Sequence, residues 1–192
     1  MSRYDDAVAA IDAANAGDPT AIAVRGAVEP LALVHGRLAT EWVERLRRGA
    51  PEPVLLAARA HHLRRWEVPR SSYPEGRPGY LRWRRDQKAR HATDVAAILG
   101  PAGYDDTEIA RVQALIKREG LGTDPDTQLV EDAACLVFVE TQLVSTAATL
   151  EPDHMVTVLQ KTAGKMSAAA IALLADVPLT DEGKAILASA FG

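Results

Sequence analysis

The apolar residues of this chain recur with the period of an α-helix over most of its length, and this pattern restricts the fold more than any other feature. Ala and Leu dominate the apolar positions, and runs of β-branched residues are few. No segment alternates between apolar and polar residues with hairpin turns at its ends, so the pattern predicts no β-sheet. We therefore expect an all-α fold.

Pro and Gly residues separate the periodic segments and set the expected helix ends. The chain has 192 residues and no repeat or linker, so we expect a single HD-like helical domain over 1–192, a bundle of about seven to eight helices. Asp124 or Asp126 is expected to open the longest of the later helices. The helices are expected at about 5–14, 30–48, 51–65, 80–99, 107–119, 127–150, 152–174 and 180–191.

Charge and composition exclude several classes of function. The net charge is −4, which argues against a nucleic-acid polymer or a membrane surface as a partner. Wholly apolar runs such as 133–139 are too short to span a bilayer, and the acidic N-terminus has no signal-peptide core. The single cysteine, Cys135, excludes an internal disulfide framework and is typical of a reducing compartment. We expect a cytoplasmic protein.

Two adjacent histidines, His61 and His62, close a small-residue helix just before a segment rich in Pro, Gly and Arg. His35 and His91 fall on apolar faces of other expected helices, as does Asp132. A carboxylate on an apolar face is unfavourable by several kcal/mol unless it is paired or coordinated, and imidazoles from several helices can converge on one ion.

Each of these residues also has an ordinary structural interpretation. His35 alone would be a hydrogen-bonded core histidine, Asp132 a capping or Arg-paired carboxylate, and the pair 61–62 a solvated helix end. Taken together, they predict a metal site. Its ligands are expected to be His35, His61, His62 and Asp132, at roughly 2.0 to 2.3 Å from the ion. If three of the four converge, His62 is expected to be the one turned away.

The order of His35, His61-His62, His91 and Asp132 resembles that of the HD-domain metal-dependent phosphohydrolase superfamily, over about residues 31–143. Within it, the segments 61–66 and 73–84 look similar to an uncharacterised bacterial family known only as a domain of unknown function. The superfamily resemblance implies an HD-domain-like helical fold and a divalent metal ion. The biochemical role of the smaller family is unknown.

The chain departs from the superfamily pattern at His62, where the superfamily has Asp. Because one imidazole nitrogen binds one ion, this departure favours a mononuclear site with one divalent first-row ion: Mn, Fe, Co, Ni or Zn. Three neutral histidines and one carboxylate leave such a site at +1, which should attract an anionic substrate. If the missing Asp normally activates water, Glu67 or Glu131 would have to take that role.

Arginines and aromatic residues follow the histidine pair and suggest how a substrate is held. Arg70, Arg77 and Arg84 are interleaved with Tyr73 and Tyr80, a combination that can bind phosphates and stack a ring. A solvated basic helix start is the alternative. Lys161 and Lys165 form a second candidate anion clamp, with an exposed helical face as the alternative. His91 is expected to face the metal from a greater distance and to donate to a phosphoryl oxygen.

These residues support two hypotheses of different class. The first is a metal-dependent phosphohydrolase acting on a small phosphorylated metabolite, for example a nucleotide. The second is a non-catalytic module that binds a nucleotide or phosphometabolite in the same metal-containing pocket. The expected partner is a small anionic ligand in both, and a homodimer is left open.

Overall fold

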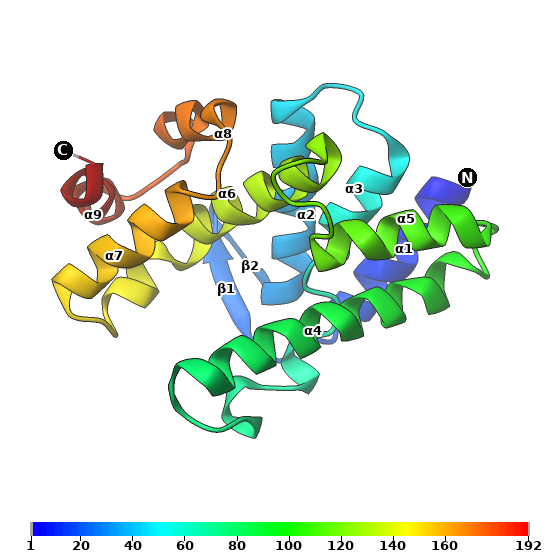
Figure 1. Cartoon of the computed structure of the whole chain (residues 1–192), viewed down its shortest axis with the longest axis horizontal. Coiled ribbons are helices and arrows are strands. Elements are labelled where there is room, and N and C mark those ends of the chain that lie inside the picture. The colour runs from blue at the N-terminus through cyan, green and yellow to red at the C-terminus, as the bar shows by residue number, and fades with distance from the viewer. Residues whose placement is uncertain (1, 192) are drawn as a thin grey trace.

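The computed structural model describes residues 2–191 and confirms a mostly α-helical fold (Figure 1). Three short 3-10 helices, η1 (Arg65–Glu67), η2 (Arg70–Ser72) and η3 (Leu173–Asp176), join longer elements. The α-helices are α1 (Arg3–Asn15), α2 (Leu31–Leu46), α3 (Glu52–Arg59), α4 (Gly76–Leu99), α5 (Asp106–Lys117), α6 (Pro125–Ala147), α7 (Pro152–Ala163), α8 (Ala168–Ala172) and α9 (Asp181–Phe191).

Helix α6 crosses the middle of the molecule and packs against α2 and α3, while α4 and α5 pair beside them (Figure 1). Trp42 of α2, Leu56 of α3 and Leu136 of α6 are among the fully buried side chains of this core. Each such side chain stabilises the fold by about 1.5 to 3 kcal/mol through its burial. The C-terminal helices α8 and α9 lie at the end of the molecule away from the N-terminus (Figure 1).

A short antiparallel hairpin departs from the expected absence of strands. Strands β1 (Ala21–Val24) and β2 (Ala27–Pro30) pair with Ala21 opposite Pro30 and Val24 opposite Ala27. Arg25 and Gly26 form the two-residue turn, with φ of 50° and 83°, as the tightest hairpin turns require. Arg25 Nε donates to Glu140 of α6 at 2.8 Å. The prediction failed because the two strands do not alternate between apolar and polar residues, Glu29 being their one charged residue, and because a distant helix holds the turn.

Two predicted helices end earlier than their periodicity suggests. The helix expected over 51–65 ends at Arg59, and the chain then turns through Arg64, which has a left-handed φ of 51°. The side chain of Asn15 in α1 accepts the Arg64 N–H at 3.0 Å, so a tertiary contact fixes this turn. The helix expected over 152–174 ends at Ala163, with Gly164 as its C-cap, and a separate α8 follows.

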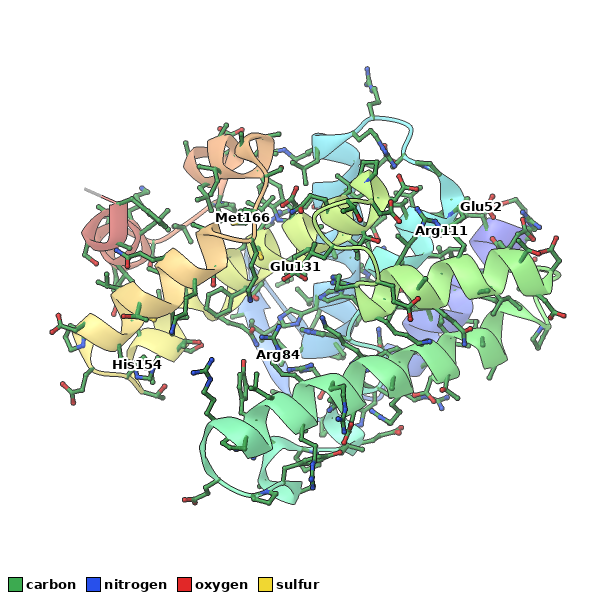
Figure 2. All side chains as sticks on the ribbon, in the orientation of Figure 1. Glu52, Arg84, Arg111, Glu131, His154 and Met166 are labelled. Atoms are coloured by element: carbon green, nitrogen blue, oxygen red, sulfur yellow. The ribbon has the colours of Figure 1, made fainter. Side chains whose placement is uncertain are left out.

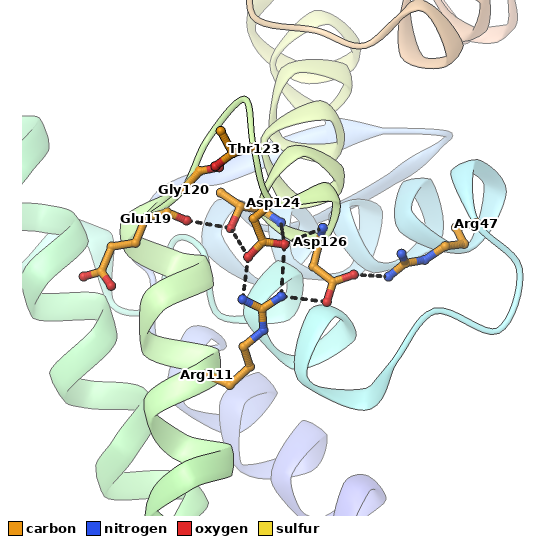
Figure 3. Close-up of polar contacts among 8 residues, drawn as sticks. Arg47, Arg111, Glu119, Gly120, Thr123, Asp124 and Asp126 are labelled. Carbon is orange, nitrogen blue, oxygen red and sulfur yellow. Dashed lines mark hydrogen bonds and ion pairs between the residues drawn. The ribbon is translucent and has the colours of Figure 1, made fainter.

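Helix α6 begins at a network of hydrogen bonds and ion pairs, shown in Figure 3. The Asp124 side chain accepts from the backbone N–H groups of Asp126 and Thr127, which confirms Asp124 as the N-cap. Arg111 of α5 donates to both Asp124 and Asp126, and Arg47 donates to Asp126 at 2.6 Å. This network joins three elements at the start of α6.

Within residues 2–191, no helix combines the length and the apolar character that crossing a membrane requires.

Candidate functional site: a pocket of histidines and basic residues

The histidine pair lies in the turn just after α3, where α2 passes at very close range. A Cβ atom on Gly36 would lie 2.5 Å from the Arg59 carbonyl oxygen, so only glycine permits this approach. The neighbouring residue, His35, is thereby brought against the turn that carries His61 and His62. Ala57, Ala58 and Ala60 are fully buried around this turn, and their small size leaves room for the imidazoles.

Four imidazoles gather at this point, three of which were predicted to converge. The ring centroids of His61 and His62 are 4.1 Å apart, and those of His35 and His62 are 5.1 Å apart. His91 of α4 is the fourth, with its ring centroid 6.3 Å from that of His62. Burial lowers the pKa of His35 and of His91 to about 3 and places those of His61 and His62 well below the ordinary value. All four are therefore neutral at pH 7.

Hydrogen bonds fix the proton position on three of the rings. His61 Nδ1–H donates to the Ala58 carbonyl at 2.8 Å, and His91 Nδ1–H donates to the Leu63 carbonyl at 2.7 Å. Their Nε2 atoms are therefore unprotonated. That of His91 is buried and has no hydrogen-bond partner among the described residues.

The third ring, His35, has the opposite tautomer. The Thr141 hydroxyl donates its only proton to the Val137 carbonyl, so it accepts from His35 Nε2–H at 3.0 Å. His35 Nδ1 is then unprotonated, and it lies 2.9 Å from His62 Nδ1. In the absence of a cation, His62 Nδ1–H donates to it. Unprotonated imidazole nitrogens gathered in one region are the chemistry that a divalent first-row ion prefers.

The predicted ligand Asp132 does not join the histidines. Its Oδ1 accepts from the Ser167 backbone N–H at 2.8 Å and from the Gln128 amide at 2.9 Å, which fastens α6 to the start of α8. Within residues 2–191, no three or more His, Cys, Asp or Glu side chains are arranged to hold a metal ion as they stand. The nitrogen donors thus match a metal ion chemically, while the carboxylate predicted with them has a structural position.

A cavity of about 230 Å³ opens beside the imidazoles, and we call it the His–Arg pocket. Figure 2 shows Arg84 of α4 and Glu131 of α6 on facing sides of this region. Tyr80 and Phe138 add aromatic rings to the lining. Besides the four histidines, the pocket is lined by one carboxylate, that of Glu131, and by five cationic side chains. These are Arg65, Arg84, Lys88, Arg118 and Lys165. The pocket is therefore strongly cationic, in a protein whose net charge is −4.

The one carboxylate is already paired. Arg118 Nε donates to Glu131 at 2.9 Å, and both side chains are at least nine-tenths buried. Arg118 also donates to the carbonyls of Leu115 and Ile116, so it links the end of α5 to α6. Opposite charge on Arg118 and Lys88 keeps the pKa of Glu131 below its ordinary value in spite of burial, so the carboxylate is ionised.

Several predicted substrate-binding and catalytic residues lie outside the pocket lining. Arg70 donates to the carbonyls of Tyr73, Pro74 and Gly76 and so holds its own loop together. The Tyr73 hydroxyl donates to Asp86, and Glu67 accepts from Arg90. Arg77 and Lys161 are exposed. The polar groups of Arg70, Tyr73 and Glu67 are thus engaged by the loop backbone and by side chains of α4, away from the pocket, and the predicted roles of these residues stay predictions.

The pocket keeps Tyr80, Arg84, His91, Lys165 and Glu131 from the predicted set and adds residues that the sequence analysis did not assign. Lys88 lies between Arg84 and His91 on the same face of α4, and this spacing was a usable signal. Arg65 comes three residues after His62 in the sequence. Arg118 enters because it adopts a left-handed conformation at the end of α5, with φ of 66°, which no local pattern indicates.

A second cavity, of about 180 Å³, adjoins the first. The two share His35, His62, Arg65 and Gln142 in their linings. Trp66, Trp83 and Leu31 make the second cavity more apolar. The Arg65 guanidinium lies 4.4 Å from the centroid of the Trp83 ring, a cation–π contact that holds it between the cavities.

The fold and the site together define a mostly α-helical protein with a cationic, histidine-rich pocket. The chain belongs to the family described as a domain of unknown function (DUF4202), whose model matches residues 5–187. This match confirms the predicted membership of an uncharacterised family, while the resemblance to the HD-domain superfamily stays a prediction. No curated protein and no solved structure matches the chain.

Proposed function

We propose that this protein binds a small phosphorylated metabolite, for example a nucleotide, in the His–Arg pocket and hydrolyses it as a metal-dependent phosphohydrolase. The observation that carries the proposal is the lining of five cationic side chains against one carboxylate. Guanidinium and ammonium groups bind phosphoryl oxygens with short, charge-assisted hydrogen bonds. The rings of Tyr80 and Phe138 offer faces for the organic part of the ligand.

In this proposal, Arg84 and Lys88 hold the phosphoryl oxygens from α4, and His91 handles a proton one turn further along. The Nδ1–H of His91 is engaged by the Leu63 carbonyl, so its free Nε2 accepts a proton from water rather than donating to the substrate. This revises the predicted role of His91 as a donor. Burial lowers the pKa of the free ring to about 3 and keeps it neutral, the carbonyl holds its orientation, and the negative charge of a bound phosphoryl group would raise this pKa toward the range that a general base needs.

A divalent ion in this proposal would be held by His35 and His61 through their unprotonated nitrogens. His35 Nδ1 would become available once His62 gives up the hydrogen bond that it donates to it, and His62 would then join as a third ligand. When bound, such an ion polarises a phosphoryl oxygen and lowers the pKa of a bound water.

A non-catalytic binding module is the second candidate, and one observation favours it. Glu131 is the one carboxylate in the pocket lining, and Arg118 holds it in a buried ion pair. No free carboxylate lining the pocket can therefore serve as the general base that was predicted for Glu67 or Glu131. Catalysis then depends on His91, and a protein that only binds its ligand needs no base.

Metal analysis of the purified protein, with phosphate release from a panel of nucleotides and sugar phosphates, tests the first candidate. We expect a bound divalent ion that His61→Ala loses, and phosphate release that a chelator abolishes. His91→Gln should keep the ion and reduce kcat by about 100-fold or more, as expected for loss of a general base. Ligand binding by the metal-loaded protein without phosphate release would favour the second candidate. If no phosphorylated compound binds, both are wrong.

A further inference from the structure

Four of the cations that line the His–Arg pocket have no carboxylate partner. Among residues 2–191, Arg118 pairs with Glu131, whereas Arg65, Arg84, Lys88 and Lys165 form no ion pair and donate no side-chain hydrogen bond to the protein. The arginines at the pocket contact aromatic faces instead: Arg65 lies over Trp83, and the Arg84 guanidinium is 5.7 Å from the Tyr80 ring centroid.

Most half-buried arginines elsewhere in the molecule form ion pairs with carboxylates. Arg59 pairs with Asp12, Arg111 with Asp124, and Arg90 with Glu67. Among the half-buried cations of residues 2–191, the three that have neither an ion pair nor a side-chain hydrogen bond, Arg65, Arg84 and Lys88, all line this one cavity. Like charges held together without counter-charges are unfavourable in the free protein, so this arrangement is typical of a site that receives its counter-charge from a ligand.

The number and spread of these cations indicate how much negative charge the ligand carries. One phosphoryl group supplies about 1.5 to 2 negative charges at pH 7, which would leave about half of the four cations unneutralised. Arg84 and Lys88 lie one turn apart on α4, Arg65 comes from η1, and Lys165 follows α7. Groups from three separate elements surround more space than one phosphoryl group fills.

We propose that the His–Arg pocket is specific for a ligand with two or more linked phosphoryl groups, a diphosphate or triphosphate, over a monophosphate. This inference rests on the proposed function in that both place the anion in the same pocket. The cavity of about 230 Å³ accommodates such a chain beside the histidines. The second cavity lies next to this one, with His35, His62 and Arg65 lining both. It can take an apolar part of the same ligand.

The pKa values of the lining cations agree with this arrangement. Burial, with Arg118 and Arg84 nearby, lowers the pKa of Lys88 from 10.5 to about 8. Burial, and to a smaller extent the positive charge of Arg84, lowers the pKa of Arg65 to about 10. Both groups remain charged at pH 7, and a polyanion in the pocket would return both pKa values toward their ordinary range.

Titration calorimetry at constant ionic strength tests the inference, with inorganic phosphate, pyrophosphate and tripolyphosphate as probes and a chelator present to exclude metal. We expect pyrophosphate and tripolyphosphate to bind at least about tenfold more tightly than phosphate. Arg84→Gln and Lys88→Gln should each weaken pyrophosphate binding about tenfold or more and reduce the preference for the longer chain. Arg82→Gln, an exposed position on the same helix, is the matched control and should change neither.

The outcomes separate this inference from the proposed function. Equal affinities for phosphate and pyrophosphate would overturn the preference for linked phosphoryl groups and leave binding of a phosphorylated metabolite standing. A preference that survives in both pocket variants would also overturn it, since another surface would then be responsible. If none of the three anions binds, the inference is wrong, while the proposed function is decided separately by the metal-loaded protein with nucleotides and sugar phosphates. Circular dichroism and thermal unfolding of each variant establish that the fold is intact.

Discussion

Neighbouring residues on one helix can have unrelated roles, and Glu131 and Asp132 of α6 illustrate this at the scale of single residues. Successive side chains on a helix point about 100° apart, and here only one of the two lines the His–Arg pocket. Glu131 does, and Asp132 instead fastens α6 to the backbone of Ser167. The periodicity of the sequence correctly placed Asp132 in the interior, where it is 2% exposed.

The role of Asp132 gives a first prediction. Asp132→Ala should lower the free energy of unfolding by about 1 to 3 kcal/mol, because the buried N–H of Ser167 loses its acceptor. Asp132→Asn keeps a carbonyl oxygen as acceptor, so its free energy of unfolding should fall by less. Urea unfolding measures both, and pyrophosphate affinity should stay within about twofold of the wild type. A folded Asp132→Asn variant that no longer binds pyrophosphate or metal would place Asp132 in the site after all.

At this scale, the sequence predicted the candidate site in part. Helical spacing identified His35, His91 and Arg84 as members of inward faces, and the structure brings all three to the pocket. It could not show that Arg70 is occupied by carbonyls of its own loop, because that depends on how residues 70–76 fold back. Hydrogen bonding between distant segments, not residue type, separates a substrate-binding arginine from a structural one.

At the scale of elements, the close approach of α2 to the end of α3 is what assembles the histidines. It depends on Gly36, because a methyl group there would overlap the Arg59 carbonyl. The sequence placed a glycine next to His35 within a helix, which is a weak signal for such a contact. The early end of α3 at Arg59 could not be predicted, since the turn that follows is held by Asn15 of α1.

Gly36→Ala therefore should destabilise the protein by about 1 to 3 kcal/mol, the usual effect of forcing a group into a packed contact. Gly17→Ala is the matched control, because a Cβ there meets nothing closer than 3.7 Å. Its unfolding free energy should change by less than about 0.5 kcal/mol. Urea unfolding of both variants measures the difference. Equal effects would show that helices α2 and α3 can separate freely at this contact.

The network at the start of α6 gives a prediction with a pH dependence. Hydrogen bonds from Arg111 hold the pKa of Asp124 well below its ordinary value. A carboxyl group with a depressed folded-state pKa stabilises the protein above its unfolded-state pKa of about 3.9, and this contribution is lost as pH falls further. Asp124→Ala should thus lower the unfolding free energy by about 0.5 to 2 kcal/mol at pH 7.

Urea unfolding of wild type and Asp124→Ala between pH 7 and pH 3 measures this window. The difference between them should stay constant down to about pH 4 and then narrow as Asp124 becomes protonated in the unfolded chain. Thr123→Ala, at an exposed neighbouring residue, is the control. A difference that is the same at pH 3 and pH 7 would show that the cap acts through packing and not through the charge of Asp124.

For the molecule as a whole, the distribution of charge matters more than its sum. A net charge of −4 suggests no anionic partner, yet unpaired cations meet at one cavity because α4, η1 and the end of α7 converge there. The periodicity of the sequence predicted the fold class. It predicted neither the hairpin nor the convergence of these cations. Both depend on contacts between segments far apart in the chain.

This arrangement predicts that the free protein is more stable without one of its pocket cations. Lys88 faces Arg84, Arg118 and Lys165, with Glu131 and His91 also in the lining, and its pKa falls from 10.5 to about 8. Below pH 8 the lysine is charged in both states and disfavours folding. As pH rises from 8 to 10.5, the folded state loses the proton first, so this penalty disappears. Lys88→Met should therefore stabilise the ligand-free protein at pH 7, on the order of 1 kcal/mol for a partly exposed group.

Urea unfolding at pH 7 and pH 10, with and without pyrophosphate, tests this last prediction. The gain from Lys88→Met should be largest at pH 7 without ligand and should shrink at pH 10. Saturating pyrophosphate, which adds about 2.7 kcal/mol at 100 times its Kd, should remove the advantage, because the wild type binds the anion more tightly. Lys161→Met, at an exposed position outside the lining, should show none of these changes. A gain in stability that is independent of both pH and ligand would mean that the methionine side chain simply packs better than lysine. The charge of Lys88 would then have no effect on stability or on anion binding in the pocket.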